Sequence, residues 1–142
     1  MPRTLLVIGT RKGCFVLESD ADRRDWKLRG PYCEGWPVYH AIHDPSSGTI
    51  YAAAASEWHG SAVWRTTDAG STWARADNGL PQEDAHLGVL REGMVADTYD
   101  VPGYYFGTST GQIFASNDDA ASWREIASYL PAISSVEVAI LD

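Results

Sequence analysis

Residues 66–73 read Thr-Thr-Asp-Ala-Gly-Ser-Thr-Trp, and this stretch decides the fold expected for the chain. An aspartate in a tight turn accepts hydrogen bonds from backbone N–H groups that the turn leaves without partners. Gly70 suits a backbone conformation that other residues resist, and the indole of Trp73 can anchor the turn between strands. The stretch therefore predicts a turn between two strands. Its structural residues are Thr66, Asp68, Gly70, Thr72 and Trp73.

The same pattern recurs on both sides of this turn. Residues 116–123 keep its polar and aromatic positions as Ser116, Asp118, Ser122 and Trp123, with alanine in place of glycine. Upstream, only the ends of the pattern are kept, as Ser19, Asp25 and Trp26, which predicts a less regular turn. The three tryptophans lie 47 and 50 residues apart. That spacing matches a four-stranded propeller blade of about 40–50 residues.

Alternating apolar and polar residues, punctuated by turn residues, predict strands around each turn. The second unit, 38–77, is expected to hold strands at 38–43, 49–55, 62–67 and 73–77, and the third, 90–128, at 92–97, 104–108, 112–117 and 123–127. The first unit, 4–30, provides only three strands, at 5–9, 14–19 and 26–29. Its fourth strand is assigned to residues 136–141, Val-Glu-Val-Ala-Ile-Leu. The expected fold is all-β: one domain, 1–142, of three four-stranded antiparallel propeller blades.

These turns resemble the repeats of the Asp-box (BNR) family, which includes sialidases, sortilin-type domains and many uncharacterised bacterial glycosyl-hydrolase-like proteins. The resemblance covers nearly the whole chain. The chain is similar to the uncharacterised bacterial members at residues 9–13, 35–40 and 105–112. The resemblance implies a β-propeller, although members of the family are usually more than twice this length.

Three blades cannot close into a ring, so a lone chain would leave two apolar sheet faces in water. We expect a homodimer that completes a six-bladed ring, with the last strand exchanged between subunits as one way to close it. A trimer with nine blades, or a chain that is part of a larger propeller, are the alternatives.

The composition of the chain narrows the classes of binding partner and the location that we expect. A net charge of −8 disfavours a nucleic-acid backbone or an anionic membrane surface. The apolar stretch before Gly9 is too short for a signal-peptide core or a membrane span, so the expected location is cytoplasmic. Cys14 and Cys33 are expected to be reduced, partly buried thiols. No cofactor is expected.

A ligand is expected on the face opposite the Asp-box turns, where loops from several blades meet. The candidate ligand-binding residues are Arg11, Trp36, Tyr39, His40, Trp58, His59, Arg91 and Glu92. Exposed aromatic rings beside polar groups favour a carbohydrate-like ligand, because pyranose faces stack on such rings. The alternatives are that Trp36 and Trp58 fill the channel or a subunit contact, and that Arg91 and Glu92 form a structural ion pair or, through symmetry, an anion or metal site.

No metal site is assigned. His40 and His43 fall on opposite faces of a strand, which leaves only His40 with His59 or His86. Glycoside hydrolysis needs two carboxylates, for which Glu92 and Glu57 are the candidates. The sialidase pattern that the resemblance implies needs three arginines, whereas this face offers Arg11 and Arg91. We therefore expect a non-catalytic oligomeric propeller that binds a ligand, such as a carbohydrate, or a protein. A glycoside-hydrolase-like enzyme and a purely structural assembly are the alternatives.

Overall fold

The computed structural model describes residues 2–56, 60–83, 87–90 and 92–141, and this part of the chain is all-β. The first sheet contains β1 (Arg3–Thr10), β2 (Gly13–Asp20) and β3 (Lys27–Tyr32), and the short 3-10 helix η1 (Cys33–Gly35) follows it. The second contains β4 (Val38–His43), β5 (Ile50–Ser56), β6 (Gly60–Thr66) and β7 (Ala74–Arg75). The third contains β8 (Met94–Ala96), β9 (Tyr104–Gly107), β10 (Ile113–Ser116) and β11 (Arg124–Ala127). Each sheet is antiparallel, with its strands paired in chain order, as expected from the sequence.

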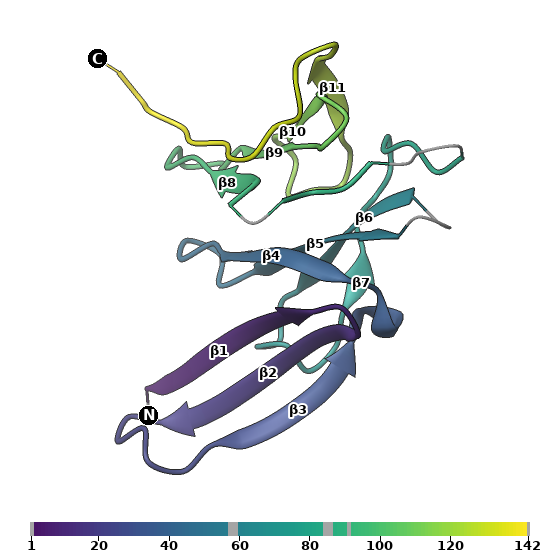
Figure 1. Ribbon diagram of the computed structural model, residues 1–142. Coiled ribbons are helices and arrows are strands. Elements are labelled where there is room, and N and C mark those ends of the chain that lie inside the picture. The colour runs from purple at the N-terminus through teal and green to yellow at the C-terminus, as the bar shows by residue number, and fades with distance from the viewer. Residues whose placement is uncertain (1, 57–59, 84–86, 91, 142) are drawn as a thin grey trace.

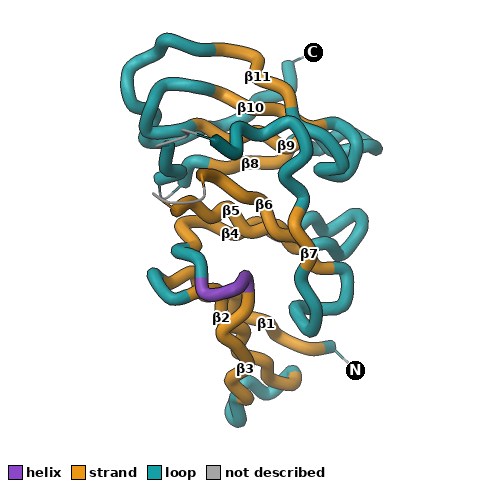
Figure 2. Tube along the Cα trace, turned by 90° about the vertical axis from the view of Figure 1, so that its right-hand side faces the viewer, coloured by secondary structure: helices purple, strands orange, loops and turns teal. Residues whose placement is uncertain are grey.

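The three sheets lie in an open stack, with the second between the other two (Figures 1 and 2). Ala52 and Ala54 of β5 belong to a core shared with the first sheet, whereas Tyr51 and Ala53 belong to a core shared with the third. A strand covered on both faces reads as a continuous apolar run rather than an alternating one. This double burial explains the four consecutive alanines of β5.

We call the face of a sheet that looks toward the next sheet in the chain its forward face, and the opposite face its backward face. Leu17, Trp64 and Phe114 each lie nine residues before a turn tryptophan and on the backward face of their sheets. Trp64 and Phe114 are buried, because a preceding sheet covers them. Leu17 is only half-buried, and Leu6 and Leu28 beside it are 46% and 62% exposed. The backward face of the first sheet is therefore an uncovered apolar surface.

The expected fourth strand of the first sheet is not formed within the chain. Residues 136–141 adopt no strand, and the first sheet consists of β1, β2 and β3. The reason lies in residues 130–136, which lead into this segment. Their N–H groups bond to the third sheet and its flanking loops: Leu130 to the Gly111 carbonyl at 3.1 Å, Ile133 to that of Thr108 at 3.1 Å and Val136 to that of Glu92 at 3.2 Å. These bonds hold the tail beside the third sheet, with the second sheet between it and β1 (Figure 1).

The other strands agree with expectation except at their ends. The first strand of the third sheet was expected at 92–97 but is shorter, Met94–Ala96. Glu92 has a φ of 67°, in the left-handed region, so it cannot continue an extended strand. The ends of such elements depend on local backbone conformation, which alternation alone does not specify.

Candidate functional site

The turn after β6 is organised by one carboxylate. Oδ1 of Asp68 accepts hydrogen bonds from the N–H groups of Ser71 and Thr72, at 3.0 and 2.8 Å, and from the hydroxyl of Thr66 at 2.8 Å. Oδ2 accepts the Thr72 hydroxyl at 2.6 Å. The Thr72 hydroxyl is the largest of the causes that lower the pKa of Asp68 to about 2. The indole N–H of Trp73 donates to the Gly70 carbonyl at 3.2 Å and closes the turn.

The turn after β10 repeats this arrangement. Asp118 accepts the Ser116 hydroxyl at 2.7 Å, and the N–H and hydroxyl of Ser122 at 3.0 and 2.5 Å. The Ser122 hydroxyl is again the main cause of a pKa lowered to about 2. Ala120 takes the place of glycine with a φ of 62°. Here the Trp123 indole donates to the Ala76 carbonyl at 2.7 Å and so ties the third sheet to the second.

The first turn lacks the carboxylate network. Ala21 lies five residues before Trp26, where the other two turns have aspartate, and Asp25 occupies the position of Thr72. The buried hydroxyl of Ser19 has no hydrogen-bond partner among the described residues. The Trp26 indole still donates three residues back, to the Arg23 carbonyl at 3.1 Å. The irregularity follows from the missing aspartate.

Arginines join each regular turn to the sheet before it. Arg29 donates to the Ala69 carbonyl at 3.0 Å and to the Ser71 hydroxyl at 2.9 Å. Arg65 donates to the Asp119 carbonyl at 3.4 Å. Ala69 and Asp119 both precede a turn tryptophan by four residues, and both have a φ of 57°. The carboxylates and carbonyls of these turns are thus used in folding, and any ligand chemistry must be sought elsewhere.

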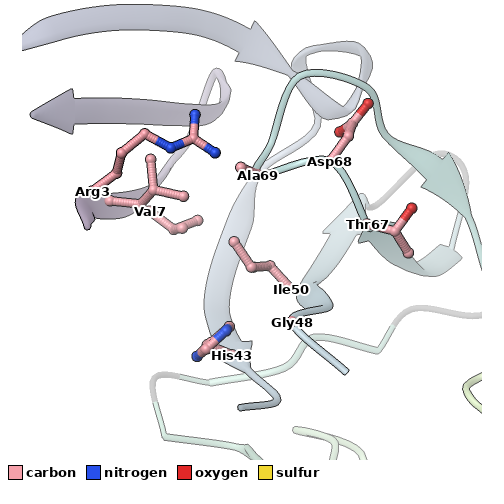
Figure 3. Close-up of a pocket in the computed structure, with 9 residues that line it drawn as sticks. Arg3, Val7, His43, Gly48, Ile50, Thr67, Asp68 and Ala69 are labelled. Carbon is pink, nitrogen blue, oxygen red and sulfur yellow. The ribbon is translucent and has the colours of Figure 1, made fainter. Parts of the chain in front are cut away.

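Two cavities lie between the first and second sheets. The larger, about 560 Å³, is at the Asp68 end and is lined by Arg3, Leu5, Val7, His43, Gly48, Ile50, Thr67, Asp68 and Ala69 (Figure 3). The sequence did not predict a cavity at this end. Its two charged groups already have partners: Arg3 is paired with Glu18 at 2.8 Å, and Asp68 binds the donors of its own turn. The remaining walls are mostly apolar.

The smaller cavity, about 440 Å³, is at the opposite end and has more available polar groups. It is lined by Gly9, Thr10, Arg11, Pro37, Val38, Tyr39 and Leu90. The expected ligand residues Arg11 and Tyr39 thus meet in one cavity, and both are exposed. A guanidinium, a phenol and the apolar side chain of Leu90 can together bind a ligand that carries hydroxyl or anionic groups and one apolar face.

His40 and Glu92 lie near each other. His40 is half-buried on β4, and burial lowers the pKa of its imidazole, while the Glu92 carboxylate acts in the opposite direction. The ring is therefore mainly neutral at pH 7 and can both donate and accept hydrogen bonds. His40 thus presents a neutral imidazole between β4 and β8, and the exposed Glu92 carboxylate acts on it electrostatically.

Trp36 lies in a different environment from Tyr39. Its ring meets that of Trp64 edge-on, with centroids 6.4 Å apart, and the Arg75 guanidinium lies 4.8 Å from its centroid. Arg75 also bonds to Gln82 at 3.0 Å and pairs with Asp77. Packing of this kind stabilises the sheet. It favours the structural alternative for Trp36 over stacking on a sugar.

Four of the candidate site residues, Glu57, Trp58, His59 and Arg91, lie outside the described residues, as does His86. The pairing of Glu57 with Glu92, and any metal site that involves His59 or His86, therefore remain predictions. Among the residues that the structure describes, no three His, Cys, Asp or Glu side chains are grouped so that they could hold a metal ion. No helix in this part of the chain is long and apolar enough to cross a membrane.

Sequence reasoning missed Pro37 and Leu90 as lining residues. Pro37 belongs to the stretch 35–40 that carried the family resemblance, which is a signal that could have pointed to it. Leu90 ends the apolar stretch 87–90 in the loop before β8, and nothing in its local sequence distinguishes it from Leu87 and Val89, which are buried in the core. Comparison with known proteins found no family model that matches the chain and no curated protein that matches its sequence.

Proposed function

We propose that this chain is a non-catalytic Asp-box propeller unit that closes into a ring with a second copy and binds a small, carbohydrate-like ligand opposite its Asp-box turns. One observation carries the ligand proposal. The cavity of about 440 Å³ collects Arg11 after β1, Tyr39 on β4 and Leu90 in the loop that leads to β8, so residues of the first and second sheets and of that loop contribute to it. Its volume falls within the range of small-molecule sites, roughly 300–1,000 Å³.

The uncovered backward face of the first sheet supports the ring. Leu6, Leu17 and Leu28 lie side by side on that face and are at least partly exposed. An apolar face of this kind is stable in water when another sheet covers it. A second copy supplies such a sheet, and two copies provide six sheets, a usual number for a propeller.

Ligand binding is tested by a glycan array, followed by titration calorimetry of the best hit. Tyr39→Ala and Arg11→Ala should each weaken binding by about tenfold or more, since each removes a contact worth roughly 1–3 kcal/mol. The matched controls are Tyr99→Ala and Arg24→Ala, which remove an exposed tyrosine and an exposed arginine that do not line the cavity. Equal affinities in Tyr39→Ala and Tyr99→Ala would contradict this site.

The neighbouring His40 and Glu92 favour one second candidate, a glycoside-hydrolase-like activity. A carboxylate beside a neutral imidazole could act as a general acid or base. Aryl-glycoside turnover that disappears in Glu92→Gln would support the enzyme. Ligand binding without turnover would support the non-catalytic function, and an intact oligomer that neither binds nor turns over a glycan would indicate a purely structural assembly.

A further inference from the structure

We propose that residues 136–141 of one copy pair with the free edge of β1 in a second copy and form the fourth strand of that copy's first sheet. This inference rests on the proposed ring and names the contact that closes it. It follows from three features of the repeat: the path of the tail, the unpaired edge of β1 and the register of the equivalent strands.

The path of the tail repeats the path that leads from β3 to β4. Residues 9–13 and 107–111 share the pattern Gly-Thr-x-x-Gly. A side chain at Gly13 would strike the Tyr32 carbonyl, and one at Gly111 would strike the Leu130 carbonyl, so Tyr32 and Leu130 occupy matching places. Val38, six residues after Tyr32, begins β4. Residue 136 lies six residues after Leu130, so residues 136–141 stand where the first strand of a following sheet belongs.

The edge of β1 is available for such a strand. In the second and third sheets, the strands that correspond to β1 are β5 and β9, and each has a neighbour on both sides. Within the described ranges β1 pairs only with β2. An unpaired strand edge is a ready template for another strand.

The register of the added strand can be derived from the other two sheets. Leu6 pairs with Leu17, just as Ala52 pairs with Trp64 and Phe106 with Phe114. On their other side, Ala52 faces Ala41 and Phe106 faces Met94. Ala41 is the fourth residue of β4, and the fourth residue of the segment 136–141 is Ala139. Ala139 should therefore lie opposite Leu6, and Ile140 opposite Leu5.

In this register the polar and apolar side chains of the tail occupy suitable positions. In β4 the register shifts at Tyr39, an exposed residue, and Glu137 holds the equivalent place. A charged side chain is therefore placed where the strand bulges toward solvent. Ile140, which is 42% exposed in the single chain, would turn to the forward face, where the equivalent Ile42 packs against the core.

The two interfaces within the chain identify a second copy as the partner. The forward face of one sheet covers the backward face of the next twice, and each time an arginine reaches a turn carbonyl. Arg124 pairs with Ala115, which holds the place of Arg65, and so it lies on the forward face of the third sheet. Its expected acceptor is the carbonyl of Asp22 in the second copy, four residues before Trp26. The same interface would then continue from copy to copy, a head-to-tail contact that two copies can close.

Site-directed crosslinking tests this strand. Differently tagged Leu6→Cys and Ala139→Cys copies are mixed and oxidised, and the bands are separated without reductant. A mixed, covalently linked pair is expected, because directly opposite Cβ atoms lie about 4.5–5.5 Å apart. The matched control is Leu6→Cys with Val138→Cys, whose side chain points to the other face of the strand, and this pair should lose the mixed band. The native Cys14 and Cys33 are buried, which limits their interference.

A mass measurement distinguishes an incorrect strand assignment from the absence of the dimeric ring. Light scattering should give twice 15.5 kDa for the unmodified protein. Ile140→Pro should lose this dimer, since proline removes a donor from the added strand, whereas Ser134→Pro, before the strand, should keep it. A dimer without the Leu6–Ala139 link would overturn the strand assignment and leave the ring. A 15.5 kDa monomer would overturn both, and the glycan titration of Tyr39→Ala reports on the ligand site independently.

Discussion

The guanidinium of Arg29 donates a 3.0 Å hydrogen bond to the backbone carbonyl of Ala69, so that a residue of the first sheet holds the turn of residues 66–73 in the second. The same guanidinium also pairs with Glu18 at 3.0 Å. Ala69 has a φ of 57°, which costs energy for a residue with a side chain. A charged donor at its carbonyl helps to stabilise that conformation, so sheet packing and turn geometry depend on each other.

Arg29→Ala should therefore destabilise the protein by about 2 kcal/mol, the usual loss for a partly buried charged hydrogen bond. The midpoint of urea unfolding measures this change. Arg24→Ala, which removes an exposed arginine of the first turn, should change the midpoint little. Equal midpoints for Arg29→Ala and Arg24→Ala would show that the contact with Ala69 contributes nothing.

A second prediction concerns the contact between Gly79 and Trp123. Gly79 has a φ of 89°, and a side chain there would strike the Trp123 carbonyl. Gly48 has a φ of 73° but open space around it. Gly48→Ala should thus cost about 1 kcal/mol for the left-handed conformation alone. Gly79→Ala should cost clearly more, by roughly 1–3 kcal/mol, because backbone atoms must also move. Similar unfolding midpoints for the two variants would contradict the close packing of the second sheet on the third.

Stability should also fall in acid. The folded pKa of Asp68 and Asp118 is about 2, below the ordinary value of 3.8, because serine and threonine hydroxyls and turn N–H groups bind the ionised form. Asp44 is similar: although its burial opposes ionisation, the hydroxyls of Ser47 and Ser46 lower its pKa to about 2. A depressed folded pKa gives stability that is present above pH 4 and is lost as the pH falls toward 2.

The melting temperature, measured at constant ionic strength, should thus be steady above about pH 5 and fall steeply between pH 4 and 2. Thr72→Val removes the hydroxyl that most lowers the pKa of Asp68. The folded pKa of Asp68 then moves back toward 3.8, so the variant should be less stable at neutral pH and should lose less of its stability between pH 4 and 2. Thr67→Val is the control, because its exposed hydroxyl lies outside that network. A melting temperature that is constant from pH 5 to pH 2 would contradict this account.

The sequence predicted those features that depend on neighbours in the chain. The hydrogen bonds of the Asp68 carboxylate and of the Trp73 indole in the turn 66–73 all lie within eight residues, so the spacing of these residues identifies the turn. β4 and β6 lie close to their expected bounds, 38–43 and 62–67, and the all-β antiparallel fold was predicted correctly. The position of the tail was not, because it depends on bonds from Leu130 and Ile133 to carbonyls about twenty residues away.

In the candidate site, too, local sequence predicted some features but not those that depend on distant contacts. Arg11 and Tyr39 were selected because their segments were expected on the face opposite the turns at 66–73 and 116–123, and they line one cavity. Trp36 was selected by the same reasoning but packs on Trp64 and beneath Arg75, from a different part of the second sheet. An aromatic residue in a loop has the same local sequence signal whether its ring is available to a ligand or covered by an arginine.

In the first turn the carboxylate network can be tested by introducing it, instead of by removing it. Ala21 occupies the place of Asp68 and Asp118, and the buried Ser19 hydroxyl beside it has no partner among the described residues. Ala21→Asp alone should add little stability. Its carboxylate would be repelled by that of Asp25, which occupies the position of Thr72. Ala21→Asp with Asp25→Thr removes that repulsion and supplies the missing hydroxyl. The double variant should be more stable by about 1–2 kcal/mol, the contribution of one or two new hydrogen bonds. Urea unfolding of all four proteins in the cycle gives the coupling between the two sites. If the two substitutions are merely additive, the carboxylate network of the regular turns does not account for their stability.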